Sequence, residues 1–262
     1  MQALCVGINN YPGTDADLAG CISDANNWAA ELTRRGFSIT LLTDKLATKA
    51  AIVEGLRRVI LDTESGQTGV FTYSGHGSWV PDLNDDEPDH RDETLCPYDI
   101  DKGMFITDDE IADMLASRKP DARIVMITDS CHSGSVFRFV GSPGVKRKIR
   151  FLPPENFLTN KEDILKARAF MRDRPAPTNK PMPGVVHMAG CRDYEYSNDT
   201  ELDGKPCGAF SHYALHTLKQ LPAGSSYLDW HKAIRLHLPN WEYQQTPQLN
   251  ATAALRRRAA FA

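Results

Sequence analysis

The chain has 262 residues, of which 41% are hydrophobic and 24% are charged. This globular composition excludes a chain dominated by disorder. It carries 30 Lys or Arg and 34 Asp or Glu, for a formal net charge of −4, which argues against a dedicated nucleic-acid-binding protein. No apolar run approaches the roughly 20 residues that a membrane-spanning helix needs, so we expect neither nucleic acid nor a membrane as a partner.

Predicted strands and helices alternate along the chain. The first strand, at 4–8, follows no basic leader or cleavage signal, so we expect a cytoplasmic protein. Further strands are predicted from apolar runs at 37–42, 69–73, 123–128 and 185–189. Helices are predicted at 17–35, from Thr48, from a Thr107 capping box to about Ser117, and near 211–221 and 227–238. This order predicts an α/β fold with a mostly parallel sheet covered by helices on both faces.

Two reactive residue types directly follow two of these strands. His76 comes after the strand at 69–73, and Cys131 comes after the strand at 123–128. In such sheets the ligand crevice lies beyond the carboxyl ends of the strands. A thiol attacks only as a thiolate, and an adjacent imidazole can take its proton and return it to a leaving amine. We therefore predict a Cys–His nucleophilic site, the alternative being a core cysteine and a turn histidine.

The residues around this pair resemble those of a known family. Tyr73-Ser-Gly-His-Gly77 and Asp129-Ser-Cys-His-Ser-Gly134 look like the histidine and cysteine motifs of metacaspases, the caspase-like cysteine peptidases. The resemblance implies a caspase-like three-layer sandwich, with His76 as base and Cys131 as nucleophile. It also implies that the backbone amides of Gly77 and Cys131 form the oxyanion hole.

The same resemblance implies how the chain is divided. Residues 1–140 would form the large catalytic part, and 184–262 the small part of the same domain. Between them, 141–183 holds ten Lys or Arg against four Asp or Glu. We interpret it as an exposed linker with a short helix near 161–172. Three interpretations of its basic charge are open: a solvated connection, a segment that the enzyme cleaves in its own chain, or a nucleic-acid contact. Self-cleavage would use one of its basic residues, Lys146, Arg147, Lys148, Arg150, Lys166, Arg168, Arg172 or Arg174.

Two acidic residues indicate the choice of substrate. The resemblance implies that Asp24 and Asp129 bind an Arg or Lys side chain before the scissile bond, with Ser74 and Cys21 lining the pocket. Two carboxylates in a narrow cleft favour a guanidinium or ammonium and reject an acidic side chain. The alternatives are compensation of the helix dipole for Asp24 and a loop cap for Asp129.

An acidic stretch raises the possibility of a metal. Residues 82–93 contain seven carboxylates, a density that Ca²⁺ recruits but that a solvated loop also shows. The resemblance implies Ca²⁺ ligands at Asp92, Asp108 and Asp109. The family's fourth ligand position is occupied by Arg138, which would repel the ion or replace it. Asp108 and Asp109 would otherwise be first-turn helix residues.

The remaining predictions concern the second half. The six cysteines contain no C-x-x-C pair, so we expect reduced thiols, with Cys191 structural. Residues 207–211 resemble the family segment that leads into a helix, and 192–205 would be a polar, mobile substrate loop.

Taken together, these features predict a monomeric cysteine endopeptidase that cuts after Arg or Lys without an organic cofactor. One alternative is a caspase-like scaffold that binds partner proteins. A nucleotide-binding domain is disfavoured because 9–13 lacks the G-x-G-x-x-G loop. An Asp-specific activity is disfavoured by Asp24 and Asp129.

Overall fold

A six-stranded sheet forms the centre of the computed structural model, which describes residues 1–81, 91–131, 147–160 and 181–262. The strand order is β12-β9-β7-β3-β1-β2. β1, β2, β3, β7 and β9 are parallel, and only β12 at the edge is antiparallel to its neighbour. The predicted, mostly parallel sheet is confirmed. Its strands are β1 (Gln2–Gly7), β2 (Ser38–Thr43), β3 (Thr68–Ser74), β7 (Arg123–Asp129), β9 (Val185–Ala189) and β12 (Gln248–Asn250).

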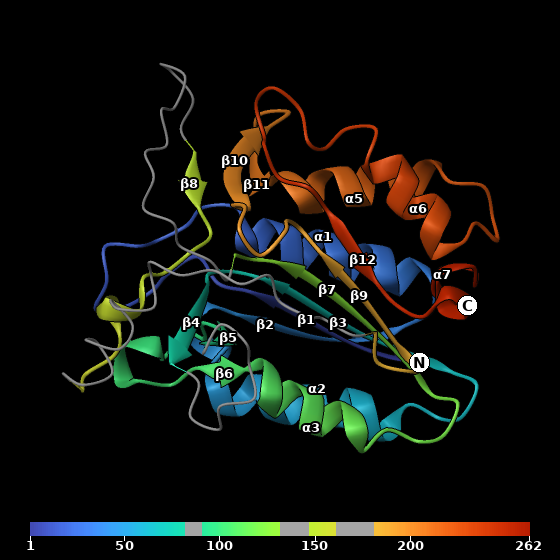
Figure 1. Cartoon of the computed structure of the whole chain (residues 1–262), viewed down its shortest axis with the longest axis horizontal. Helices are drawn as coiled ribbons and strands as arrows, with labels where there is room; N and C mark the ends of the chain where they lie inside the picture. The colour runs from blue at the N-terminus through green and yellow to red at the C-terminus, as the bar shows by residue number, and fades with distance from the viewer. Residues whose placement is uncertain (82–90, 132–146, 161–180) are drawn as a thin grey trace.

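Helices cover both faces of this sheet (Figure 1). α2 and α3 lie on one face, and α1, α5 and α6 lie on the other, so the predicted three-layer α/β sandwich is confirmed. The helices are α1 (Cys21–Arg34), α2 (Lys49–Asp62), α3 (Asp108–Ala116), α5 (Ala209–Gln220), α6 (Tyr227–Ile234) and α7 (Ala253–Arg256), with short 3₁₀ turns η1 (Asp44–Leu46), η2 (Ile100–Lys102) and η3 (Pro154–Asn156). No helix of the described residues has the length and apolar character to cross a membrane.

The side chains of β1 divide the interior into two cores. Successive strand residues point to opposite faces, so Leu4 packs in the cluster that contains Leu56 of α2. Its neighbour Cys5 packs in the cluster that contains Trp28 of α1. β3 and β7 are buried along their whole length, as expected of parallel strands covered on both faces. The centre of the sheet is therefore a rigid base for the loops that leave β3 and β7.

The predicted helix starts are correct where a side chain caps them. Thr48 accepts a hydrogen bond from the amide of Ala51 at the start of α2, and Thr107 and Glu110 form the predicted capping box of α3. α1 begins at Cys21 and not at residue 17, because the cap comes from a distant residue. The side-chain oxygen of Asn9 accepts from the amides of Cys21 and its successor at 2.8 and 3.2 Å.

Two small sheets flank the carboxyl end of the central sheet. One contains β4 (Gly77–Pro81), β5 (Arg91–Leu95) and β6 (Ile106–Thr107), and the other contains β8 (Lys148–Ile149), β10 (Asn198–Leu202) and β11 (Lys205–Gly208). The prediction of a mobile loop at 192–205 is wrong for its second half, which is a β-hairpin. Asp203 and Gly204 both have positive φ, of 52° and 70°, and form the tight turn that an Asp-Gly pair favours.

The predicted linker is only partly described, and its described part is not exposed throughout. Arg150 and Leu152 are both completely buried, and Phe157 is buried as well. The interpretation as an exposed connection is therefore wrong at these three positions, whose side chains pack against the rest of the domain, whereas Lys148 and Asn160 are exposed as predicted. The predicted helix near 161–172 lies outside the described residues.

Candidate active site

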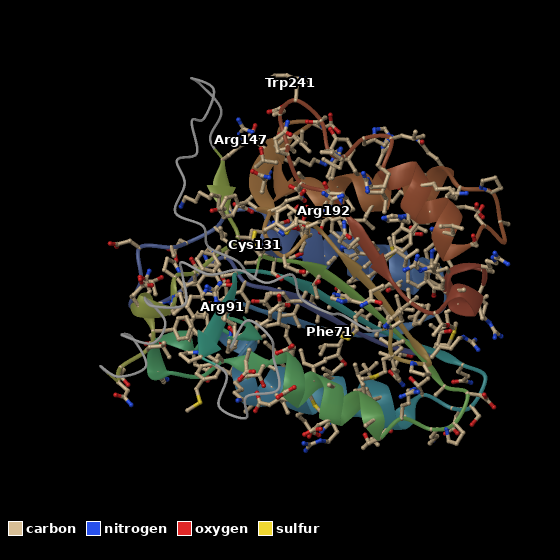
Figure 2. The ribbon with its side chains drawn as sticks, in the orientation of Figure 1. Phe71, Arg91, Cys131, Arg147, Arg192 and Trp241 are labelled. Atoms are coloured by element: carbon tan, nitrogen blue, oxygen red, sulfur yellow. The ribbon has the colours of Figure 1, made fainter. Side chains whose placement is uncertain are left out.

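The sheet topology brings His76 and Cys131 to the same edge. β3 and β7 are adjacent parallel strands, and their last residues, Ser74 and Asp129, are paired in register. The two loops therefore leave the sheet side by side at its carboxyl end, as predicted. Figure 2 shows Cys131 beyond the end of β7, close to β8. His76 and Cys131 are both buried.

The His76 imidazole is held in one orientation. Its Nε2 lies 2.6 Å from the carbonyl oxygen of Ala16, which can only accept, so Nε2 carries the proton. Nδ1 is buried and has no hydrogen-bond partner among the described residues. Tyr11 packs on the ring with centroids 4.6 Å apart and accepts from the His76 amide at 2.7 Å. Burial lowers the pKa of His76 to about 4, so the neutral ring offers Nδ1 as a base.

The Cys131 thiol is held by a residue that the sequence did not single out. The amide of Ser197 donates to its Sγ at 2.6 Å, and the Ser197 carbonyl oxygen lies 3.5 Å from the same sulfur. The Cys191 thiol lies next to that of Cys131. A hydrogen bond between the two thiols raises the pKa of Cys191, and burial raises it further. All six cysteines are free and buried, in agreement with the prediction of reduced thiols.

A backbone carbonyl of this same chain lies between the two predicted oxyanion-hole amides. The amides of Gly77 and Cys131 both donate to the carbonyl oxygen of Arg150 at 3.0 Å. The main chain on either side is also fixed. The Arg150 amide donates to Ser197, and the Leu152 amide donates to Gly77, each at 3.0 Å. A peptide segment thus crosses the site in an extended conformation, with one carbonyl at the two amides.

The Arg150 side chain fills an acidic pocket beside this carbonyl. Its Nη2 lies 2.7 Å from the Asp24 carboxylate and 3.0 Å from that of Asp199, and its Nη1 lies 3.1 Å from that of Asp129. All four side chains are buried. Asp24 and Asp129 were predicted to bind a cation together, and the structure places them on one guanidinium. Asp199 was missed, although the Asp-Gly turn signal of its hairpin was present in the sequence.

The other two predicted pocket residues, Cys21 and Ser74, are both buried at the same end of the sheet. Burial raises the pKa of the Cys21 thiol, and the positive charge of Arg150 opposes this rise. Ser74 is buried at the end of β3, level with Asp129. Burial also raises the pKa of Asp24 to about 7, and the Asp129 carboxylate adds to this rise while Arg150 opposes it.

Gly208 closes the pocket on the side of the small sheet. A Cβ at this position would lie 2.1 Å from the Oδ2 of Asp129 and 2.5 Å from the Nη1 of Arg150. The Gly208 amide also donates to both carboxylate oxygens of Asp24, at 3.1 and 3.0 Å. The absence of a side chain here makes room for a flat cationic group between the acidic residues.

The predicted calcium ligands Asp92, Asp108 and Asp109 lie on neighbouring elements of the structure. The pairing of Thr94 with Thr107 brings β5, which carries Asp92, beside the start of α3, where Asp108 and Asp109 lie. Even so, no three His, Cys, Asp or Glu residues in the described ranges are placed together as a metal would require. Arg138 and residues 82–90 lie outside those ranges.

The family model and several curated relatives that match this chain are metacaspases. The family model of the metacaspase, peptidase C14 domain, matches residues 1–140. Metacaspase-1B of Aspergillus fumigatus is 31% identical over 97% of this chain and 70% of the relative, and Metacaspase-1 of Candida glabrata is 30% identical over 96% and 72%. The chain spans 62% of Metacaspase-1 of Cryptococcus neoformans, at 29% identity. The crystal structure of protein GSU0716 from Geobacter sulfurreducens superposes with a TM-score of 0.74 at 28% identity, covering 100% of this chain and 98% of that one.

Proposed function

Since this chain belongs to the metacaspase family, peptidase C14, we propose that it is a cysteine endopeptidase that cleaves after Arg or Lys. One observation carries the proposal. Arg150 has its carbonyl oxygen on the amides of Gly77 and Cys131 and its guanidinium on the carboxylates of Asp24, Asp129 and Asp199. This is the arrangement that a bound substrate residue needs before attack.

The chemistry follows from the atoms around that carbonyl. Nδ1 of His76 takes the proton of the Cys131 thiol, and Sγ attacks the carbonyl carbon of the residue held in the acidic pocket. The amides of Gly77 and Cys131 stabilise the negative charge that develops on the oxygen. His76 then gives its proton to the leaving amine, and water hydrolyses the thioester that remains on Cys131.

The pocket also supports the choice of side chain. A guanidinium can meet three carboxylates at once, and an ammonium can meet them as a point charge. An aspartate in the substrate would add a fourth buried carboxylate to Asp24, Asp129 and Asp199. An uncompensated buried charge costs several kcal/mol, so we expect an acidic residue to be rejected by more than about 100-fold.

We further propose that the Arg150–Phe151 bond is a site of self-cleavage. The bond already lies at Cys131 in the uncut chain, and Arg150 has to leave the pocket before another substrate can enter. The two pieces would stay together, because Leu152 and Phe157 remain buried in the core and β9 pairs with β7. The uncut chain would thus be a zymogen whose pocket is occupied by its own arginine.

The experiment that tests the proposed function is hydrolysis of fluorogenic peptides that end in Arg, Lys or Asp. Turnover of the Arg and Lys peptides, with none of the Asp peptide, would support it. No turnover of any peptide would overturn it in favour of a caspase-like protein that binds partners. Calcium activation through Asp92, Asp108 and Asp109 remains a prediction. Loss of turnover with a chelator and its return with Ca²⁺ would support that prediction, and unchanged turnover would overturn it.

The raised pKa of Asp24 predicts a pH dependence of substrate binding. With a cation in the pocket this pKa is about 7, so Asp24 loses its negative charge as the pH falls below 7. Without the cation the pKa of Asp24 lies higher, because the lowering effect of the guanidinium is lost, so we expect KM for an Arg peptide to rise as the pH falls from 9 towards 7. In Asp24→Asn, KM should be high at every pH, without this step. Measurement of KM from pH 5 to pH 9 for both proteins checks this, and an equal step in the variant would contradict it.

A further inference from the structure

We propose that the enzyme also selects a basic residue three positions before the residue whose carbonyl is attacked, through a subsite formed by Glu242 and Tyr243. The inference rests on the proposed function, because it takes 147–150 as the enzyme's own bound substrate. In that segment Arg150 occupies the acidic pocket, and Arg147 lies three positions earlier.

The segment is bound as an added strand. β8 pairs antiparallel with β10, with Ile149 opposite Asn198 and Lys148 opposite Asp199, and the Arg150 amide continues the pattern to Ser197. Main-chain hydrogen bonds of this kind fix the register of a peptide whatever its sequence. A substrate with its cleaved residue in the acidic pocket would therefore place its earlier side chains where 147–149 now lie.

Arg147 meets a defined subsite in this register. Its Nη1 donates to the carbonyl oxygen of Glu242, and its guanidinium carbon lies 5.7 Å from the centre of the Tyr243 ring. The ring is buried, and its hydroxyl shares a 3.1 Å hydrogen bond with Thr200 of β10. Asn240 fixes the turn, since its side-chain oxygen accepts from the amides of Glu242 and Tyr243 at 2.8 and 2.7 Å.

The charges near the subsite favour a cation. The Glu242 carboxylate adds to burial in raising the pKa of the Tyr243 hydroxyl, so negative charge lies beside the ring. A cation over an aromatic face, together with a hydrogen bond from a charged donor, stabilises binding of Arg or Lys. Figure 2 shows Arg147 beyond Cys131, on the side of the molecule where Trp241 is labelled.

The neighbouring position gives an internal contrast. Lys148 is exposed, and its ammonium contacts only the carbonyl oxygen of Asp17, at 2.5 Å, among the bonds that the described residues show. An exposed contact of this kind contributes little. We therefore expect the enzyme to discriminate at the position of Arg147 and to be nearly indifferent at the position of Lys148.

The test compares four fluorogenic peptides that all end in Arg: Arg-Lys-Ile-Arg, Ala-Lys-Ile-Arg, Glu-Lys-Ile-Arg and Arg-Ala-Ile-Arg. We expect Ala in the first place to lower kcat/KM about 10-fold and Glu to lower it further, from the energies of cation–aromatic and charged hydrogen bonds. Ala in the second place should cost less than about threefold. Equal turnover of all four would overturn this inference and leave the proposed function intact. No turnover of any peptide would overturn the proposed function and this inference with it.

A matched set of variants locates the preference. Tyr243→Phe keeps the aromatic face and should keep the ratio of Arg to Ala peptide. Tyr243→Leu should reduce the ratio to below about threefold, because only the Glu242 carbonyl remains. Tyr98→Leu removes a half-buried tyrosine that precedes η2 and should leave the ratio unchanged. An unchanged ratio in a folded Tyr243→Leu variant would overturn the assignment of the subsite.

Discussion

Replacing Cys131 by alanine is expected to lower turnover of an Arg peptide by at least about 10⁴-fold, since the nucleophile of covalent catalysis is lost. The change removes one sulfur atom that contacts Ser197 and leaves the amide that donates to the Arg150 carbonyl in place. The fold of the site should therefore persist while the chemistry stops. Initial rates with a fluorogenic Arg peptide measure the loss.

The control for this variant is another buried cysteine. Cys5 lies on β1 in the core that contains Trp28, and Cys5→Ala should keep most of the activity if the variant folds. Turnover retained by Cys131→Ala would show that a different residue is the nucleophile, and the mechanism proposed for this site would be wrong.

Asp129→Asn is expected to lower kcat/KM for an Arg peptide by up to about 100-fold. The Asp129 carboxylate lies 3.1 Å from the Arg150 guanidinium and accepts from the amide and hydroxyl of Ser211 at 3.0 and 2.7 Å. An asparagine keeps the shape but not the charge, and a hydrogen bond to a charged group contributes about 1.5–3 kcal/mol, while Asp24 and Asp199 still contact the cation. KM should carry much of the loss, because the cation is bound before the reaction begins.

Glu31→Gln makes the same chemical change at another buried carboxylate. Glu31 pairs with Arg34 and Arg35 of the α1 region, at 2.7 Å each, and contributes nothing to the acidic pocket. Its variant should keep wild-type KM. Thermal unfolding of both variants shows whether a loss of activity reflects a loss of fold. An unchanged KM in a folded Asp129→Asn protein would contradict the assignment of the pocket.

The sequence was most informative where local pattern decides the structure. His76 and Cys131 each follow a short apolar run, and the carboxyl ends of parallel strands meet at one edge. Their juxtaposition could therefore be predicted before any coordinates. The joint role of Asp24 and Asp129 was predicted from the resemblance to metacaspases, and both carboxylates contact the guanidinium of Arg150.

The residues that the sequence did not predict come from contacts between distant segments. Ser197 directly precedes the β10–β11 hairpin and Asp199 lies in it, and they contact Asp129 at the end of β7 and Gly20 at the start of α1. No local sequence pattern shows where a polar hairpin will dock. Its Asp203-Gly204 turn was a readable signal for the hairpin itself. Asn9, which caps α1 from twelve residues away, moved the helix start for the same reason.

Composition alone could not predict that Arg150, among the basic residues of the linker, occupies the acidic pocket. The linker contains ten Lys or Arg residues that suit an Arg- or Lys-specific peptidase equally well, so charge alone could not separate them. Arg150 differs because the main chain beside it pairs with β10 and its carbonyl reaches the amides of Gly77 and Cys131. That choice depends on three-dimensional register, which no sequence pattern in the linker encodes.

The most direct test of this account is the identity of the new N-terminus after the purified chain has been incubated at neutral pH, read by sequencing and intact mass. We expect a fragment that begins at Phe151, absent from Cys131→Ala and from Arg150→Gln but still formed by Lys148→Ala. An uncut wild-type chain under conditions where it hydrolyses Arg peptides, or a cut elsewhere with Arg150–Phe151 intact, would contradict the claim that this bond is bound as a substrate.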